Sequence, residues 1–415
     1  MMKYCAIVDG CSTGKYYPFY LKKNGYQCIH IQSTLNIPKA AKNSFNPNDY
    51  VELFVFQGDH EKLITALSKY PIEFIIPGSE PGVELADNLS TTLNLYPNEL
   101  GCGKRCRDKF LTGEALRKQG VRSIKQQKIK SIAEAILWAE THNTWPLVIK
   151  PLDSGGGDGF YSCQNVSELT HAVRSVLGSK TIFDKVNEEI LIQEFIAGTE
   201  YVVNTVSCNG RHFVESFMVY EKQKRSDGRL ICETENLMCP SNHPQAEEMF
   251  HYTFTVLDAL GVKYGAAHNE LMLTAQGPVL MECNGRPHGN SLPKDILTEC
   301  LGHTQVELTA LSYSNQNAFL NYLRTPRSIL KHMTLVHLIF HSEGIVQKID
   351  FMKEIENLPS FHSHRLYVAP GEQIGRTIDL PSSPGNVFLC SENREQIRAD
   401  IKKLREYETE GIFKI

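Results

Sequence analysis

The chain has 415 residues, which exceeds the usual length of one domain and fits two or three domains. Hydrophobic residues make up 41% of the chain and charged residues 22%, which is typical of a globular protein. The formal net charge of −4 argues against sequence-independent binding to nucleic acid or an anionic membrane, and no apolar run reaches the ~20 residues that span a bilayer.

The N-terminal segment and the cysteines indicate the cellular compartment. Residues 1–10 contain one lysine and a short apolar stretch interrupted by Asp9, so they predict a first strand and not a secretion signal. The twelve cysteines are scattered and form no CxxC pair, which favours reduced thiols and no Cys/His metal site. We therefore expect a cytoplasmic protein.

Strand-like and helix-like segments alternate through residues 1–100. The predicted strands are Tyr4–Val8, Cys28–Ile31 and Phe74–Pro77, and the predicted helices are Tyr17–Asn24 and Glu61–Lys69. This alternation predicts an N-terminal α/β domain with a small parallel sheet. Within it, Glu80 follows the third strand and is a candidate to hold a substrate ammonium, with helix capping as the alternative.

The segment Gly10–Lys15 looks like a phosphate-binding P-loop. It is one residue shorter than GxxxxGK[ST], and Tyr16 stands where a magnesium-binding hydroxyl is required. We therefore reject a P-loop, although the turn can still lie at the open edge of the sheet, where ligands often bind.

Residues 101–190 are interpreted as linker helices followed by a small domain. We predict helices at Asp108–Gln119 and Ile132–Thr141, and a strand at Pro146–Lys150. Lys150 is followed by a glycine-rich loop, in which backbone N–H groups can approach phosphate oxygens without a side-chain clash. The candidate phosphate-binding residues of the loop are Ser154, Gly155, Gly156 and Gly157.

Residues 191–415 are interpreted as a large domain with a C-terminal extension. Its first predicted elements are the strands Ile190–Phe195, Glu200–Ser207 and Arg211–Tyr220, and a helix at 244–260. The first strand ends in a linker whose carbonyl and N–H groups can bind an adenine edge, and Glu200 can accept from ribose hydroxyls. The candidates in this linker are Gln193, Glu194, Phe195 and Ile196, although alone the segment is an ordinary strand-loop-strand.

The segments Glu270–Thr274 and Pro278–Asn284 predict a hairpin with its turn at 275–277. Glu270 then faces Glu282, Thr274 faces Pro278 and Met272 faces Leu280, while the opposite face is covered by core residues that include Met281. Two opposed carboxylates repel each other, and a hard cation between them would remove this penalty. Glu270, Glu282 and Asn284 are therefore candidate Mg²⁺ ligands, with a solvent-exposed polar face as the alternative.

Taken in order, these motifs resemble the ATP-grasp superfamily over nearly the whole chain. Within it, His268-Asn-Glu270, Glu282-x-Asn284-x-Arg286 and a tail with Gly371, Gly375, Thr377 and Gly385 are most similar to L-amino-acid ligases and dipeptide synthetases of the bacilysin and dapdiamide type. The resemblance implies an ATP-grasp fold of mixed α/β and α+β structure with an N-terminal Rossmann-like domain. It also implies an ATP- and Mg²⁺-dependent carboxylate-amine ligase that forms an acyl phosphate and releases ADP and phosphate.

The resemblance also implies individual roles. Lys109 and Lys150 would contact phosphates, the backbone of Glu194 and Ile196 the adenine, and Glu200 the ribose. Glu270, Glu282 and Asn284 would bind magnesium, and Arg286, a catalytic residue together with Lys150, would steady the acyl phosphate.

The substrate side is less defined by the sequence. His268, His288 and Asn290 are candidate substrate contacts, and structural histidines are the alternative for the first two. Bacilysin-type enzymes have a tryptophan where this chain has Asn290, which implies a larger or more polar pocket. Amino-acid-like small molecules are the expected partners, and a homodimer is open. Another ATP-grasp reaction, such as cofactor carboxylation or a nucleotide-biosynthesis ligation, and a non-catalytic nucleotide-binding protein are the alternatives.

Overall fold

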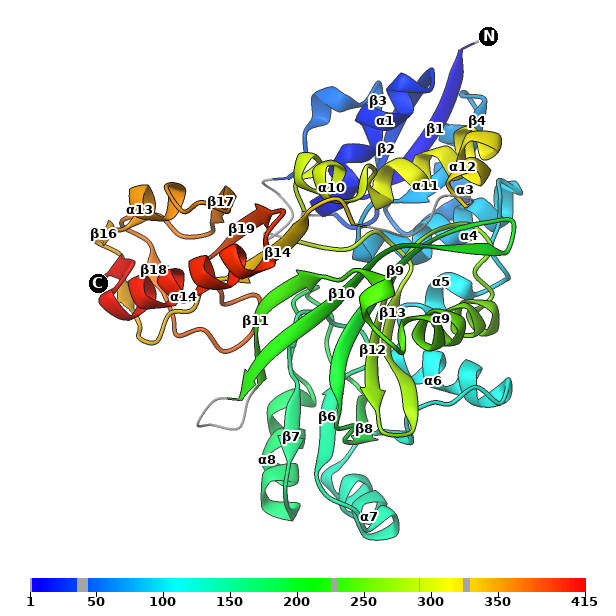
Figure 1. The fold of residues 1–415 in the computed structure, drawn as a ribbon. Helices are drawn as coiled ribbons and strands as arrows, with labels where there is room; N and C mark the ends of the chain where they lie inside the picture. The colour runs from blue at the N-terminus through cyan, green and yellow to red at the C-terminus, as the bar shows by residue number, and fades with distance from the viewer. Residues whose placement is uncertain (1, 36–43, 225–229, 291, 324–328) are drawn as a thin grey trace.

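The computed structural model describes residues 2–415 apart from 36–43, 225–229, 291 and 324–328. Figure 1 shows the N-terminal unit in blue, the small sheet with its helices in teal, the large sheet in green, and the C-terminal extension in orange and red. Within the described ranges, no helix combines the length and apolar character that crossing a membrane requires. All twelve cysteines lie in the described part of the chain and are free thiols.

The N-terminal sheet is parallel, as predicted, with the strand order β3-β2-β1-β4. Both faces are covered, one by α3 and α4 and the other by α1 and the distant helix α11, which contributes Val306, Ala310 and Tyr313. The elements are β1 Lys3–Val8, α1 Tyr17–Lys23, β2 Tyr26–Gln32, β3 Glu52–Val55, α3 His60–Leu67, β4 Ile72–Pro77, α4 Val83–Leu93 and α11 Gln305–Ser314.

The small antiparallel sheet has the order β5-β8-β6-β7, and α7 and α8 pack on it through one apolar cluster. Its elements are β5 Gln126–Ile129, α7 Ile132–His142, β6 Leu147–Pro151, β7 Tyr161–Cys163, α8 Val166–Val176 and β8 Ile190–Glu194. The boundary predicted at residues 190 and 191 passes through β8, because this strand pairs with β5 and β6 and not with the large sheet.

The large sheet has eight strands in the order β13-β12-β9-β10-β11-β14-β19-β17. The last three strands, β14, β19 and β17, come from residues 330–415, which we call the C-terminal extension. The extension therefore continues this sheet (Figure 1). The strands are β9 Thr199–Cys208, β10 Arg211–Lys224, β11 Leu230–Leu237, β12 Gly265–Thr274, β13 Gly277–Asn284, β14 His332–His337, β17 Phe361–Leu366 and β19 Gly385–Ser391.

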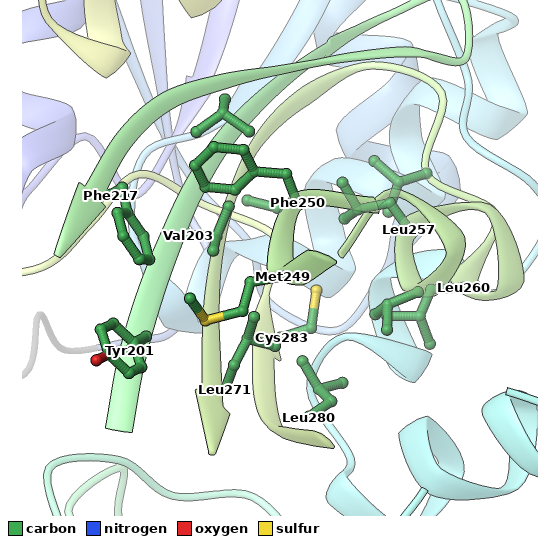
Figure 2. Close-up of a cluster of buried hydrophobic side chains, with 14 of the residues drawn as sticks. Tyr201, Val203, Phe217, Met249, Phe250, Leu257, Leu260, Leu271, Leu280 and Cys283 are labelled. Carbon is green, nitrogen blue, oxygen red and sulfur yellow. The ribbon is translucent and has the colours of Figure 1, made fainter. Parts of the chain in front are cut away.

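The core of the large sheet lies between its strands and helix α9, Ala246–Leu260. Figure 2 shows Met249 and Phe250 of this helix facing Tyr201, Phe217 and Leu271 of the sheet. At roughly 25 cal/mol per Å² of buried apolar surface, large side chains of this kind hold β12 and β13 firmly in place. The edge of the sheet that carries Glu270 and Glu282 is therefore a rigid support.

The hairpin of β12 and β13 pairs Glu270 with Glu282, as predicted. Its turn holds two residues and not three, so the predicted partners of Thr274 and Met272 were each wrong by one residue. A bulge on β13 inserts Met281 and restores the pairing of the two glutamates. The prediction that Met281 faces the core was wrong, because the bulge turns it to the cavity and sends Leu280 into the core.

The remaining elements connect or cover these sheets. They are α5 Cys102–Arg105, α6 Lys109–Lys118, α10 Lys294–Leu301, α12 Gln316–Tyr322, α13 Met352–Glu356, α14 Arg394–Glu410, and the short strand pairs β15 Gly344–Ile345 with β18 Gln373–Ile374 and β16 Lys348–Ile349 with β20 Phe413–Lys414.

Candidate active site

A cavity of about 1900 Å³ lies where the N-terminal unit, the small sheet, the large sheet and the C-terminal extension meet. All but one of the predicted site residues line it: Glu80, Lys109, Lys150, Ser154, Gly155, Gly156, Gly157, Gln193, Glu194, Phe195, Ile196, Glu200, His268, Glu270, Glu282, Arg286, His288 and Asn290. The exception is Asn284, which is buried with its amide against Glu282. The structure therefore brings the predicted residues together, and their individual roles stay predictions.

The glycine-rich loop is held at both ends. Ser154 donates to Asp158 at 2.6 Å, and the Lys109 ammonium donates to the Ser154 carbonyl at 2.8 Å. Gly156 has φ +67°, and a Cβ at this position would lie 3.1 Å from Pro381 of the C-terminal extension. The backbone N–H of Leu380 also donates to the Gly156 carbonyl at 3.3 Å. Glycine is thus required here by both the backbone angle and the close approach of the extension.

Two lysines and three carboxylates lie close together in the same cavity as this loop. Lys109 lies 3.1 Å from Glu282. Burial and the charge of Lys109 lower the pKa of Lys150 to about 8, although Glu282, Glu270 and Glu200 act in the opposite direction. Both lysines line the cavity, where they can contact an anionic ligand.

The oxygen donors at this edge fit a magnesium ion. Glu270 and Glu282 are paired on adjacent strands and supply the carboxylate oxygens. The Asn284 amide nitrogen donates to Glu282 Oε1 at 3.1 Å, so the oxygen of this amide does not face the pair here. Carboxylate and amide oxygens are the donors that Mg²⁺ takes in proteins. The Lys109 ammonium shows that this carboxylate cluster attracts positive charge.

A buried ion-pair network joins three parts of the chain. Glu80 bonds Arg107 through Oε1 and accepts from Arg286 Nε at 2.5 Å through Oε2, and Arg107 also bonds Asp153 at the start of the glycine-rich loop. Burial raises the pKa of Glu80, but the charges of Arg286 and Arg107 outweigh it and lower this pKa to about 2. Glu80 is thus an ionised partner of Arg286, and the alternative of a helix cap is wrong because Ser79 occupies the cap position.

Comparisons with known proteins agree with this geometry. A sequence model of the ATP-grasp domain matches residues 143–295. The chain is 34% identical to dapdiamide A synthase of Enterobacter agglomerans over 412 residues, which are 97% of this chain and 95% of that protein. The chain belongs to the ATP-grasp family of that synthase.

Solved structures extend the ATP-grasp likeness over the whole fold. The L-amino acid ligase from Bacillus licheniformis superposes with a TM-score of 0.77 at 18% identity, covering 97% of both chains. N5-carboxyaminoimidazole synthase from Aspergillus clavatus, solved in complex with ADP, has a TM-score of 0.68 at 16% identity over 98% of both chains. At these identities the likeness concerns the fold alone.

A second buried polar network of this ATP-grasp chain centres on Glu235 of β11, which is fully buried. It lies 2.9 Å from His337 and 3.1 Å from His288, and Asn290 Nδ2 donates to it at 2.8 Å. Burial raises the pKa of Glu235, but hydrogen bonds and charges of His288 and His337 lower it well below the ordinary value. With Cys232, Glu235 and His337 form a close Cys/Glu/His group that the sequence did not indicate.

Asn290 has an unusual backbone conformation beside this network. Its φ of +59° lies in the left-handed region, and its carbonyl accepts from Arg365 at 3.0 Å. Helix α10 has Pro293 as its N-cap, so Asn290, three residues earlier, does not cap this helix. Asn290 therefore lies in the cavity wall between the large sheet and the C-terminal extension.

Sequence reasoning missed several residues of the ATP-grasp site. Arg107 and Glu235 lie outside any motif and are recognised only by the partners that folding brings to them. Lys222, on the neighbouring strand β10, forms an ion pair with Glu200, and the two charged atoms are 2.6 Å apart. The available signal was the adjacency of the two predicted strands: Glu200 pairs with Tyr220, and Lys222 lies two residues further along the same strand.

Proposed function

We propose that this protein is an ATP-dependent ligase that joins the carboxylate of one amino-acid-like substrate to the amine of another. The carboxylate is first converted into an acyl phosphate, and the products are an amide, ADP and phosphate. The observation that carries this proposal is the convergence of Arg286, Lys109 and Lys150 with the Glu270–Glu282 pair in one cavity. The 34% identity to dapdiamide A synthase supports an amide-forming reaction.

Charge neutralisation is the main task of these residues. A carboxylate resists attack by an amine until its oxygen leaves as phosphate, and phosphoryl transfer depends mostly on positioning and electrostatics. Lys109 and Lys150 would contact phosphate oxygens, and Arg286 offers fixed charge and forked donors to the acyl phosphate and the tetrahedral intermediate. Glu270, Glu282 and Asn284 would hold Mg²⁺, which shields phosphate charge when bound.

Positioning and the exclusion of water complete the proposal. The backbone at Glu194–Ile196 would bind adenine, and Glu200, held by Lys222, would bind ribose. The glycine-rich loop and Pro381 would cover the phosphates, so that water does not hydrolyse the intermediate. Because both oxygens of Glu80 are engaged by arginines, we propose that Glu80 orients Arg286 in preference to holding a substrate ammonium.

The proposal is tested by phosphate release from ATP across a matrix of L-amino-acid pairs, with product masses and nucleotide chromatography. We expect one or more pairs to yield an amide with one ADP and one phosphate per bond. Stoichiometric AMP would refute the acyl-phosphate route. Carboxylation of an added amine with bicarbonate, without reaction of any amino-acid pair, would favour a different ATP-grasp reaction.

A further inference from the structure

The rejected P-loop segment of the N-terminal unit lies in the wall of the active-site cavity. Cys11, Ser12 and Lys15 line this wall, in a short 3-10 helix at Ser12–Tyr16. Gly14 packs so tightly on the next loop that a Cβ would lie 2.2 Å from the Gly78 carbonyl oxygen. The segment is therefore a fixed part of the cavity wall.

Lys15 faces a second cation across the cavity. Arg365, at the end of β17 in the C-terminal extension, also lines this cavity. The segments that carry them are attached to consecutive carbonyls: Thr13, in the same 3-10 helix as Lys15, donates through Oγ1 to Gly289 at 3.0 Å, and Arg365 Nη1 donates to Asn290 at 3.0 Å. These carbonyls follow Arg286 by three and four residues, so the two cations lie next to the predicted acyl-phosphate position.

The positive charge of Lys15 is not neutralised by a neighbouring carboxylate. Lys15 forms no ion pair within 4.0 Å with any residue that the structure describes, and its ammonium lies 5.0 Å from the centre of the Tyr16 ring. Burial and then the charge of Arg365 lower the pKa of Lys15. A half-buried ammonium with no carboxylate beside it and a second cation nearby is destabilising unless an anion binds to it.

We propose that Lys15 and Arg365 form a binding site for the carboxylate of the amine-donating substrate. This inference rests on the proposed ligase function and specifies its second substrate as an amino acid with a free carboxylate. The phosphates of ATP are assigned to the glycine-rich loop and Lys150, on the small sheet, whereas Lys15 belongs to the N-terminal unit and Arg365 to the C-terminal extension. A carboxylate held by these cations would direct the amine of the same molecule toward the acyl phosphate beside Arg286.

The test compares L-amino acids with their carboxamides as amine donors, because the amide removes the carboxylate and keeps the amine. In Lys15→Met, we expect the KM for the best amino acid to rise at least about tenfold, the size of one charged hydrogen bond. The KM values for its carboxamide, for ATP and for the carboxylate-donating substrate should change little. Arg365→Lys should give a smaller rise than Arg365→Met. Lys62→Met, an exposed lysine of α3, is the matched control and should behave as wild type.

Three results would overturn the proposal: an unchanged KM for the amino acid, an equal rise for the amino acid and its carboxamide, or a rise confined to the carboxylate-donating substrate. The last would assign the site to the other substrate. A readout without turnover separates this proposal from the ligase proposal. Acetic anhydride labelling of Lys15, followed by peptide mass spectrometry, should be slowed by the L-amino-acid panel and not by the amides. Labelling that both or neither panel slows refutes the site, whereas absent turnover refutes only the ligase activity.

Discussion

The substitution Glu80→Gln tests whether the buried charge between Arg107 and Arg286 stabilises the protein. Glutamine keeps the shape of the side chain and removes its charge. The side chains of Glu80, Arg107 and Arg286 are 12%, 6% and 17% exposed, so solvent screens their interactions only weakly. Removing the carboxylate leaves two guanidinium groups without their shared anion, which is the costly way to break a buried ion pair.

The magnitude follows from the pKa of Glu80, which is lowered from 4.5 to about 2. At 1.36 kcal/mol for each pH unit, this difference corresponds to about 3 kcal/mol of stability. Because the pKa is lowered on folding, the contribution is complete above about pH 4.5 and is lost as the pH falls toward 2. We therefore expect Glu80→Gln to be about 3 kcal/mol less stable at pH 7 and to show a weaker loss of stability between pH 4.5 and 2.

Denaturant unfolding at pH 7 and pH 3 measures this effect, and turnover reports on the orientation of Arg286. We expect the kcat of Glu80→Gln to fall while its KM for ATP changes little. Glu299→Gln is the control, because its ion pair with Lys331 is exposed and should contribute at most about 1 kcal/mol. A Glu80→Gln variant as stable as wild type at pH 7, or a loss of equal size at pH 3 and pH 7, would refute the reasoning.

Three further predictions concern the catalytic cavity. Glu282→Ala should abolish turnover and weaken Mg²⁺-dependent ATP binding, which titration calorimetry with and without Mg²⁺ measures. Near-normal turnover in this variant would refute the metal assignment. Because the pKa of Lys150 is about 8, the ammonium is lost as the pH rises through 8. The kcat/KM for ATP should therefore fall above that pH in wild type and stay level in Lys150→Arg; identical profiles would contradict this. Asn290→Trp should shift the substrate profile toward smaller carboxylate donors. Asn290→Ala, which also loses the hydrogen bond to Glu235, is the control and should not cause this shift. If a substrate screen gives the same profile for Asn290→Trp and wild type, Asn290 has no role in the pocket.

The sequence by itself determined the features that depend on neighbouring residues. Periodicity predicted the parallel N-terminal sheet, because alternating strands and helices have few other ways to bury their apolar faces. The hairpin itself was predicted because its two strands are close in the chain, but its register was wrong by one residue near the turn, and the bulge at Met281 is what brings Glu270 opposite Glu282. The order of motifs from Lys109 to Arg286 carried the resemblance that implied the ATP-grasp fold, and the fold brings these motifs to one cavity.

Only the tertiary structure decided the contacts between distant segments. The partners of Arg107 are 27 and 46 residues away, and those of Glu235 are 53 and 102 residues away along the chain, so local periodicity carries no signal for them. The bulge at Met281 depends on how β13 packs against helix α9, which hairpin geometry alone does not specify. Lys15 and Arg365 likewise line one cavity only because the C-terminal extension continues the large sheet. Packing across the whole fold, and not local propensity, brings these distant segments together.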